Sequence, residues 1–119
     1  MRDFRELKVW EKAHALTLRL YTLTRTFPRD EQYGLTAQIR RAAASIGANI
    51  AEGSGRRTSR DFARYLQVAL GSASELQYHL VLAADLQLVS RADYEQLDGG
   101  MVEVKRMLTG FIKKLTADG

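Results

Sequence analysis

The sequence predicts an all-α protein that folds as an antiparallel up-down-up-down four-helix bundle. Apolar residues recur at intervals of three and four over four long stretches, a spacing that puts them on one face of a helix. Breaks in this pattern are few: Pro28 is the single proline, and glycines cluster at a few sites. No stretch alternates apolar and polar residues in the manner of a strand, so a β-sheet is not expected.

Length and composition fit a single domain over residues 1–119. Hydrophobic residues make up 45% of the chain, enough for a core without cross-links, and the absence of cysteine excludes disulfides and thiolate chemistry. The first residues lack the apolar segment of a secretory signal, and no apolar run approaches the roughly 20 residues that cross a membrane. We therefore expect a cytoplasmic protein without membrane contact.

The first helix is expected over about residues 6–26, because Phe27-Pro28 interrupts the pattern. Its apolar residues fall on two sides of the helix. One side carries Val9, Leu16, Leu20 and Leu23, and the other carries Leu7, Trp10, Leu18 and Tyr21. A lone bundle buries one such face, so the second face predicts contact with another subunit.

The second helix is expected over about residues 35–52, where the apolar stripe runs from Leu35 to Ile50. The glycines of Gly53-Ser54-Gly55 are typical of a helix C-terminus and predict its end.

The last two helices are expected over about residues 59–87 and 91–116. Thr58 and Ser90 each precede an aspartate by three positions, a spacing close to that of the capping box. Gly99-Gly100 lies inside the last helix and is expected to weaken it by about 1 kcal/mol per glycine. Short connections between long helices favour packing of successive helices in opposite directions.

Motifs for catalysis and metal binding are missing from the sequence. A di-iron bundle needs Glu-x-x-His pairs, whereas the nearest candidate, Glu75 with His79, is spaced by four. No Gly-x-Ser-x-Gly elbow, P-loop or dinucleotide fingerprint is present. We expect no enzymatic activity, metal, cofactor or small-molecule substrate. The alternative is an enzyme in which Asn49, Glu52 or His79 meet in a pocket.

A polar edge follows the apolar stripe of the second helix at three-to-four spacing. It consists of Gln38, Arg41, Ser45, Asn49 and Glu52. Such side chains can hydrogen-bond across helices or across a subunit boundary and fix their register. We favour this structural interpretation, and a ligand or RNA site is the alternative.

Basic residues are concentrated after the second helix of this chain, whose net charge is +4. The candidates lie in a glycine-bounded loop, in the helix after it and in the helix before it: Arg56, Arg57, Arg60, Arg64, Arg40 and Arg41. Guanidinium groups pair with phosphate oxygens, and helix N-termini favour anions. These arginines are therefore the candidate RNA- or DNA-binding residues, and a solvated loop beside a capped helix is the alternative.

Several segments, in order over almost the whole chain, carry a family resemblance. They are Phe4–Trp10, Phe27-Pro28, Tyr33–Leu35, Gln38–Ala42, Ser45–Gly53 and Ala69–Leu76. The most specific is Ser45-Ile46-Gly47-Ala48-Asn49-Ile50-Ala51-Glu52-Gly53. Together they resemble the small bacterial 23S rRNA intervening-sequence proteins.

The resemblance implies an antiparallel four-helix bundle that assembles as a ring-shaped homopentamer. Related bundles act as accessory proteins of diversity-generating retroelements, and the family brings no established catalytic residues. We therefore expect a non-enzymatic homo-oligomer that binds RNA or DNA through its arginine loop. The alternative is a protein–protein interaction scaffold, or an accessory subunit for a partner protein.

Overall fold

The computed structural model describes residues 3–117, and within that range it contains helices and no strand. Four α-helices carry the fold: α1 (Lys8–Thr24), α2 (Leu35–Ser54), α3 (Ser59–Asp85) and α4 (Arg91–Thr116). Two short 3-10 turns, η1 (Phe4–Glu6) and η2 (Arg29–Glu31), precede α1 and α2. The prediction of an all-α protein with four helices is confirmed.

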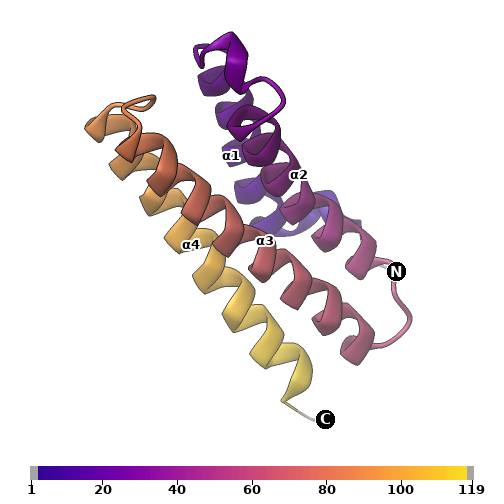
Figure 1. The fold of residues 1–119 in the computed structure, drawn as a ribbon. Coiled ribbons are helices and arrows are strands. Elements are labelled where there is room, and N and C mark those ends of the chain that lie inside the picture. The colour runs from indigo at the N-terminus through magenta and orange to yellow at the C-terminus, as the bar shows by residue number, and fades with distance from the viewer. Residues whose placement is uncertain (1–2, 118–119) are drawn as a thin grey trace.

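The four helices lie side by side along the long axis of a molecule that measures 46 × 22 × 20 Å. α3 packs on α2 and on α4, and α1 packs on α2 and on α4 (Figure 1). Within the described residues α1 does not pack on α3, so these two helices are diagonal to each other. The α2–α3 connection and the last turn of α4 lie at one end, and the other two connections lie at the opposite end.

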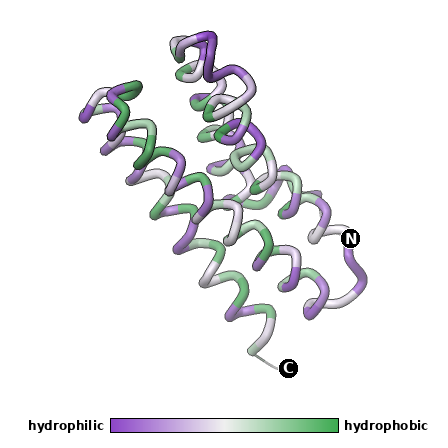
Figure 2. The backbone as a smooth tube through the Cα atoms, in the orientation of Figure 1, coloured by the Kyte–Doolittle hydropathy of each residue, from purple (hydrophilic) through white to green (hydrophobic). Residues whose placement is uncertain are grey.

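A single hydrophobic core runs between the helices. Leu20, Ile46, Leu76 and Leu108, one from each α-helix, are fully buried. Figure 2 shows apolar and polar residues interleaved along every helix, as the three-to-four spacing predicts. Burying one side chain of this size contributes about 1.5–3 kcal/mol, so the stripes account for the way the helices pack together.

α1 is shorter at both ends than the range of residues 6–26 predicted for it. Asp3 accepts a hydrogen bond from the backbone N–H of Arg5 at 2.9 Å and holds η1 as a separate turn. Leu7 then adopts an extended backbone, with φ −81° and ψ 125°, so the helix begins only at Lys8. A side-chain cap on a short turn therefore replaces the expected first turn of the helix.

α2 continues through Gly53, two residues beyond its predicted end. Gly53 is buried, and a Cβ atom there would lie 2.7 Å from Cβ of Tyr65 and 3.0 Å from Cδ1 of Phe62. This glycine therefore permits the close approach of α2 and α3, and Gly55 ends the helix instead.

The predicted caps of α3 and α4 form. Thr58 Oγ1 and Ser90 Oγ accept hydrogen bonds from the backbone N–H groups of Asp61 and Asp93, each at 3.1 Å. α3 ends at Asp85, two residues before its predicted end, and Gln87 in the following turn takes a positive φ of 62°. α4 runs without interruption through its paired glycines.

Candidate nucleic-acid interface

Cations gather where the α2–α3 connection meets the last turn of α4. We call this region the basic end; it consists of the exposed residues Arg56, Arg57, Arg60, Arg64, Lys113 and Lys114. Lys113 and Lys114 were not predicted from the sequence, because they follow Arg64 by 49 and 50 positions in the chain. The signal that would have found them is the order of the helices, which brings the C-terminus of α4 to the N-terminus of α3.

A cleft of about 400 Å³ opens between the α2–α3 connection and α4. Arg56, Arg57 and Lys114 line it together with Phe62 and Phe111, whose ring centroids are 5.1 Å apart at 71°. The first turn of α3 adjoins the cleft, and the first N–H groups of an α-helix have no partner within the helix. The cleft is therefore cationic and borders an apolar edge-to-face aromatic pair.

Two of the arginines are held in place by neighbouring side chains. Arg56 lies 3.3 Å from the carboxylate of Glu52, and its guanidinium lies 4.6 Å from the centre of the Tyr65 ring. Arg64 pairs with Asp61 at 3.2 Å. Exposed pairs of this kind contribute about 0–1 kcal/mol, so a phosphate can compete for either guanidinium.

Arg57 and Arg60 form no ion pair with any residue in the range 3–117. Both are exposed, so their charges face solvent. They are the two guanidinium groups at the basic end most available to an anion.

Arg40 does not lie at the basic end. Its Nε atom donates to Thr24 Oγ1 at 2.8 Å, its Nη2 atom donates to the Tyr21 carbonyl at 3.2 Å, and its guanidinium lies 4.7 Å from the centre of the Tyr21 ring. A cation in this position stabilises the carbonyl end of α1.

Arg41 is also remote from the basic end, because it precedes Arg56 by about four helical turns, roughly 20 Å along α2. It bonds Gln38 and Glu75. The structure therefore divides the six predicted arginines into four at the basic end and two with contacts elsewhere in the bundle.

The polar edge of α2 lies against α3. Ser45 Oγ and Ser72 Oγ are 2.8 Å apart, and Asn49 Nδ2 donates to the Ser45 carbonyl at 2.8 Å and to Ser45 Oγ at 3.1 Å. Gln38 and Glu52 bond arginines, Arg41 and Arg56 respectively. Of these bonds, the Ser45–Ser72 contact crosses to α3, whereas the others join residues three or four apart in and just after α2.

Glu75 and His79 form a small polar cluster beside Arg41. His79 Nε2 is 3.2 Å from Glu75 Oε2, and the hydrogen bonds from His79 and then from Arg41 hold the pKa of Glu75 below its usual value. The Nδ1 atom of His79 is buried without a partner among the described residues.

The enzyme alternative required Asn49, Glu52 or His79 to meet in a pocket. Each bonds a different neighbour: Ser45, Arg56 and Glu75. Within residues 3–117 no group of three or more histidine or acidic side chains is arranged to hold a metal ion.

The helices of the described range are also too short or too polar to cross a membrane.

Fold and surface together define a small all-α protein of four helices, with six exposed cations clustered at one end of the bundle. The chain belongs to the 23S rRNA-intervening sequence protein family, whose model matches residues 5–110. The resemblance seen in the sequence is thereby confirmed.

A solved structure agrees with this assignment. The chain is similar to the crystal structure of a protein of unknown function from the S23 ribosomal protein family of Bacteroides thetaiotaomicron, with 29% identity and a TM-score of 0.82. The match covers 88% of this chain and 95% of that one. No curated protein matches the chain.

Proposed function

We propose that this chain is a non-enzymatic, cytoplasmic homo-oligomer that binds RNA or DNA through its basic end. In this proposal the subunit is an antiparallel up-down-up-down bundle, and copies assemble as a ring, with five copies implied by the family resemblance. The cross-helix contacts support the antiparallel order, since Arg41 bonds Glu75 while Ser45, further along α2, bonds Ser72, earlier on α3.

The observation that carries the proposal is the convergence of the α2–α3 connection and the end of α4 around one cationic cleft. Lys and Arg side chains that neutralise phosphates release counterions, which is the main source of sequence-independent affinity for nucleic acid. The family name describes where its genes are found, inside intervening sequences of rRNA genes, and not an activity. The similar structure comes from the S23 ribosomal protein family, and this makes RNA the first ligand to test. A ring repeats the basic end in every copy, so weak individual contacts add up through multivalency.

The test compares two variants of equal charge. In the first, Arg56, Arg57, Arg60 and Arg64 are all changed to Gln; in the control, the same change is made at Lys12, Arg19, Arg29 and Arg106. Binding of a labelled single-stranded RNA is followed by fluorescence anisotropy from 50 to 300 mM salt.

For the parent, the logarithm of the association constant should fall steeply with the logarithm of salt, by about 0.7 per phosphate contact on a single strand. The basic-end variant should lose about three units of this slope if all four contacts are lost, whereas the control keeps the parent slope. Equal losses in the two variants, or no binding by the parent at 50 mM salt, would refute the proposal.

A second function, a scaffold for a partner protein, is favoured by large apolar side chains on the surface. Tyr33 is 90% exposed in the connection before α2, and Leu86 is 52% exposed at the same end of the molecule. Recovery of one stoichiometric protein that survives nuclease treatment, with no RNA retained, would favour this function over the first.

A further inference from the structure

The outer face of α1 carries apolar surface that this bundle does not bury. Leu18 is 57% exposed and Tyr21 is 39% exposed. Leu18 is two residues from both Leu16 and Leu20, which are buried, so it points away from the core. Glu11 and Arg25 are exposed near the two ends of the same face.

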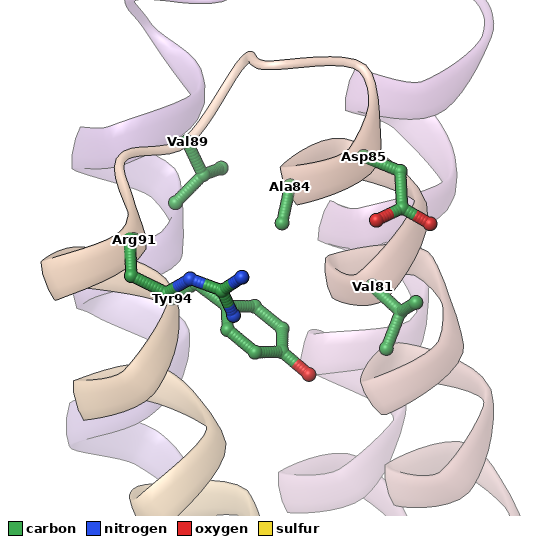
Figure 3. Close-up of a pocket in the computed structure, with 6 residues that line it drawn as sticks. All are labelled: Val81, Ala84, Asp85, Val89, Arg91 and Tyr94. Carbon is green, nitrogen blue, oxygen red and sulfur yellow. The ribbon is translucent and has the colours of Figure 1, made fainter.

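The groove between α3 and α4 has a hollow near each of its ends. The first, of about 530 Å³, is lined by Gln67, Leu70, Gly71, Ser74, Thr109, Ile112 and Lys113. The second, of about 170 Å³, is lined by Val81, Ala84, Asp85, Val89, Arg91 and Tyr94 (Figure 3). Between the hollows, Gln77 bonds Asp98 at 3.0 Å and Lys105 at 3.1 Å across the groove. Tyr78 and Val102, 60% and 40% exposed, add apolar surface on the same two helices.

Gly71 in the first hollow has no explanation within this chain. Glycine in mid-helix weakens the helix, and Gly71, like Gly99 and Gly110, has no atom within 4 Å of the place where its Cβ would be; of the three, only Gly71 lines a hollow of this groove. The absence of a side chain at Gly71 would allow a second helix to lie close to the backbone of α3.

We infer that the α3–α4 groove receives α1 of a second copy of this chain, an inference that rests on the homo-oligomer of the proposed function and names its interface. The lengths agree: the 17 residues of α1 extend about 26 Å, and the groove from Gln67 to Asp85 extends about 27 Å.

One register of parallel helices brings apolar side chains level with each other and places an acidic residue opposite a lysine. When Arg25 of one copy is level with Asp85 of the next, Leu18 is level with Tyr78, because seven residues separate the members of each pair. In the same register Tyr21 is level with Val81. Glu11 is then level with Gly71, opposite Lys113 in the first hollow. The second hollow holds Arg91 beside Asp85, so charge distinguishes the two orientations at the first hollow. There the parallel register places Glu11 opposite Lys113, whereas the reverse orientation places Arg25 near Lys113, where like charges repel.

The parallel orientation is also the one that closes a ring. α1 and α3 begin at the same end of the bundle, so rotation about an axis parallel to the helices brings them together in the same direction. Because α1 and α3 are diagonal, one copy can present α1 to one neighbour and its groove to the other. Every basic end then lies on the same side of the assembly.

The experiment measures mass in solution by light scattering and native mass spectrometry, without nucleic acid. Leu18→Glu places a charge on the α1 face, and Gly71→Gln places a longer side chain, of a good helix former, in the first hollow, where its Cβ would meet no atom of its own chain. Tyr33→Glu is the control, because it makes the same kind of change at an exposed site outside both faces. Circular dichroism checks that each variant keeps its helices.

The parent and Tyr33→Glu should form the same oligomer, and each of the two interface variants alone should weaken assembly 100-fold or more. Mixing the two should produce a one-to-one dimer, because the intact α1 of the Gly71→Gln copy fits the intact groove of the Leu18→Glu copy. A monomeric parent, an unchanged Leu18→Glu oligomer or the absence of a mixed dimer would overturn the interface. The basic-end variant should assemble like the parent, so loss of assembly and loss of RNA binding are separate results.

Discussion

The close approach of α2 and α3 at Gly53 predicts that Gly53→Ala destabilises the fold although alanine is the better helix former. Alanine raises helix propensity by about 1 kcal/mol relative to glycine. Against this, the new Cβ would lie 2.7 Å from Cβ of Tyr65, an atom fixed to the backbone of α3, and 3.3 Å from the Phe62 carbonyl. The two helices must separate by several tenths of an ångström or more, and overpacking of this kind costs about 1–3 kcal/mol.

The matched control is Gly99→Ala, where nothing lies within 4 Å of the new Cβ. Helix propensity changes equally in both variants, so the difference between them isolates the steric contribution. We expect Gly99→Ala to gain about 1 kcal/mol in free energy of unfolding. Gly53→Ala should fall about 2–3 kcal/mol below it, toward the upper end of the overpacking cost, because the nearest neighbour is a Cβ atom fixed to the backbone. The assay is urea denaturation followed by circular dichroism, at one protein concentration because self-association shifts the midpoint. Equal stabilisation by the two alanines would show that Gly53 is not a packing glycine and would refute the reasoning.

Two further predictions concern the α2–α3 contact. Ser45→Ala removes the partner of Ser72 Oγ and one of the two acceptors of Asn49 Nδ2, and it should cost about 1–2 kcal/mol. Ser72→Ala leaves both Asn49 bonds in place and should cost about half as much. A double-mutant cycle in urea measures the coupling between the two serines, and additive losses would contradict it. The pKa of Glu75 is lowered in the folded state by His79 and then Arg41, so its contribution to stability is present above the usual glutamate pKa of about 4.3 and is lost as pH falls below that value. Glu75→Gln should therefore flatten the acid side of the stability profile between about pH 5 and 3, and an unchanged slope there would contradict the assignment.

The sequence was sufficient for the elements whose cause is local. The apolar stripes, the caps at Thr58 and Ser90 and the four-helix class follow from spacing along the chain, and the structure has them. The end of α2 could not be predicted in the same way. A glycine at this position normally indicates a helix C-terminus, and the sequence does not show that Gly53 packs against Tyr65 and Phe62 of the next helix.

The candidate site likewise has a part that the sequence predicts and a part that only the packing of the helices reveals. Four arginines of one loop and helix start are neighbours in sequence and in space. Arg40 is assigned differently by the structure because its contacts, Thr24 and Tyr21, belong to another helix. Lys113 and Lys114 join the basic end through the order of the helices, which no local pattern contains. Contacts between residues far apart in the sequence determine which charged side chains are exposed without a partner, and the packing of the helices determines those contacts.

The short α2–α3 connection also has a consequence for the entropy of binding. A long flexible loop that carries arginines must be ordered when it binds, and each immobilised side chain of this kind costs about 0.5–1.5 kcal/mol. Here the connection between Ser54 and Ser59 spans four residues, and the two helices it joins are held together at Gly53. Tyr65 and Glu52 already restrict Arg56. The backbone of the basic end and the side chain of Arg56 are thus ordered before binding, so the entropy cost falls mainly on the free side chains such as Arg57 and Arg60.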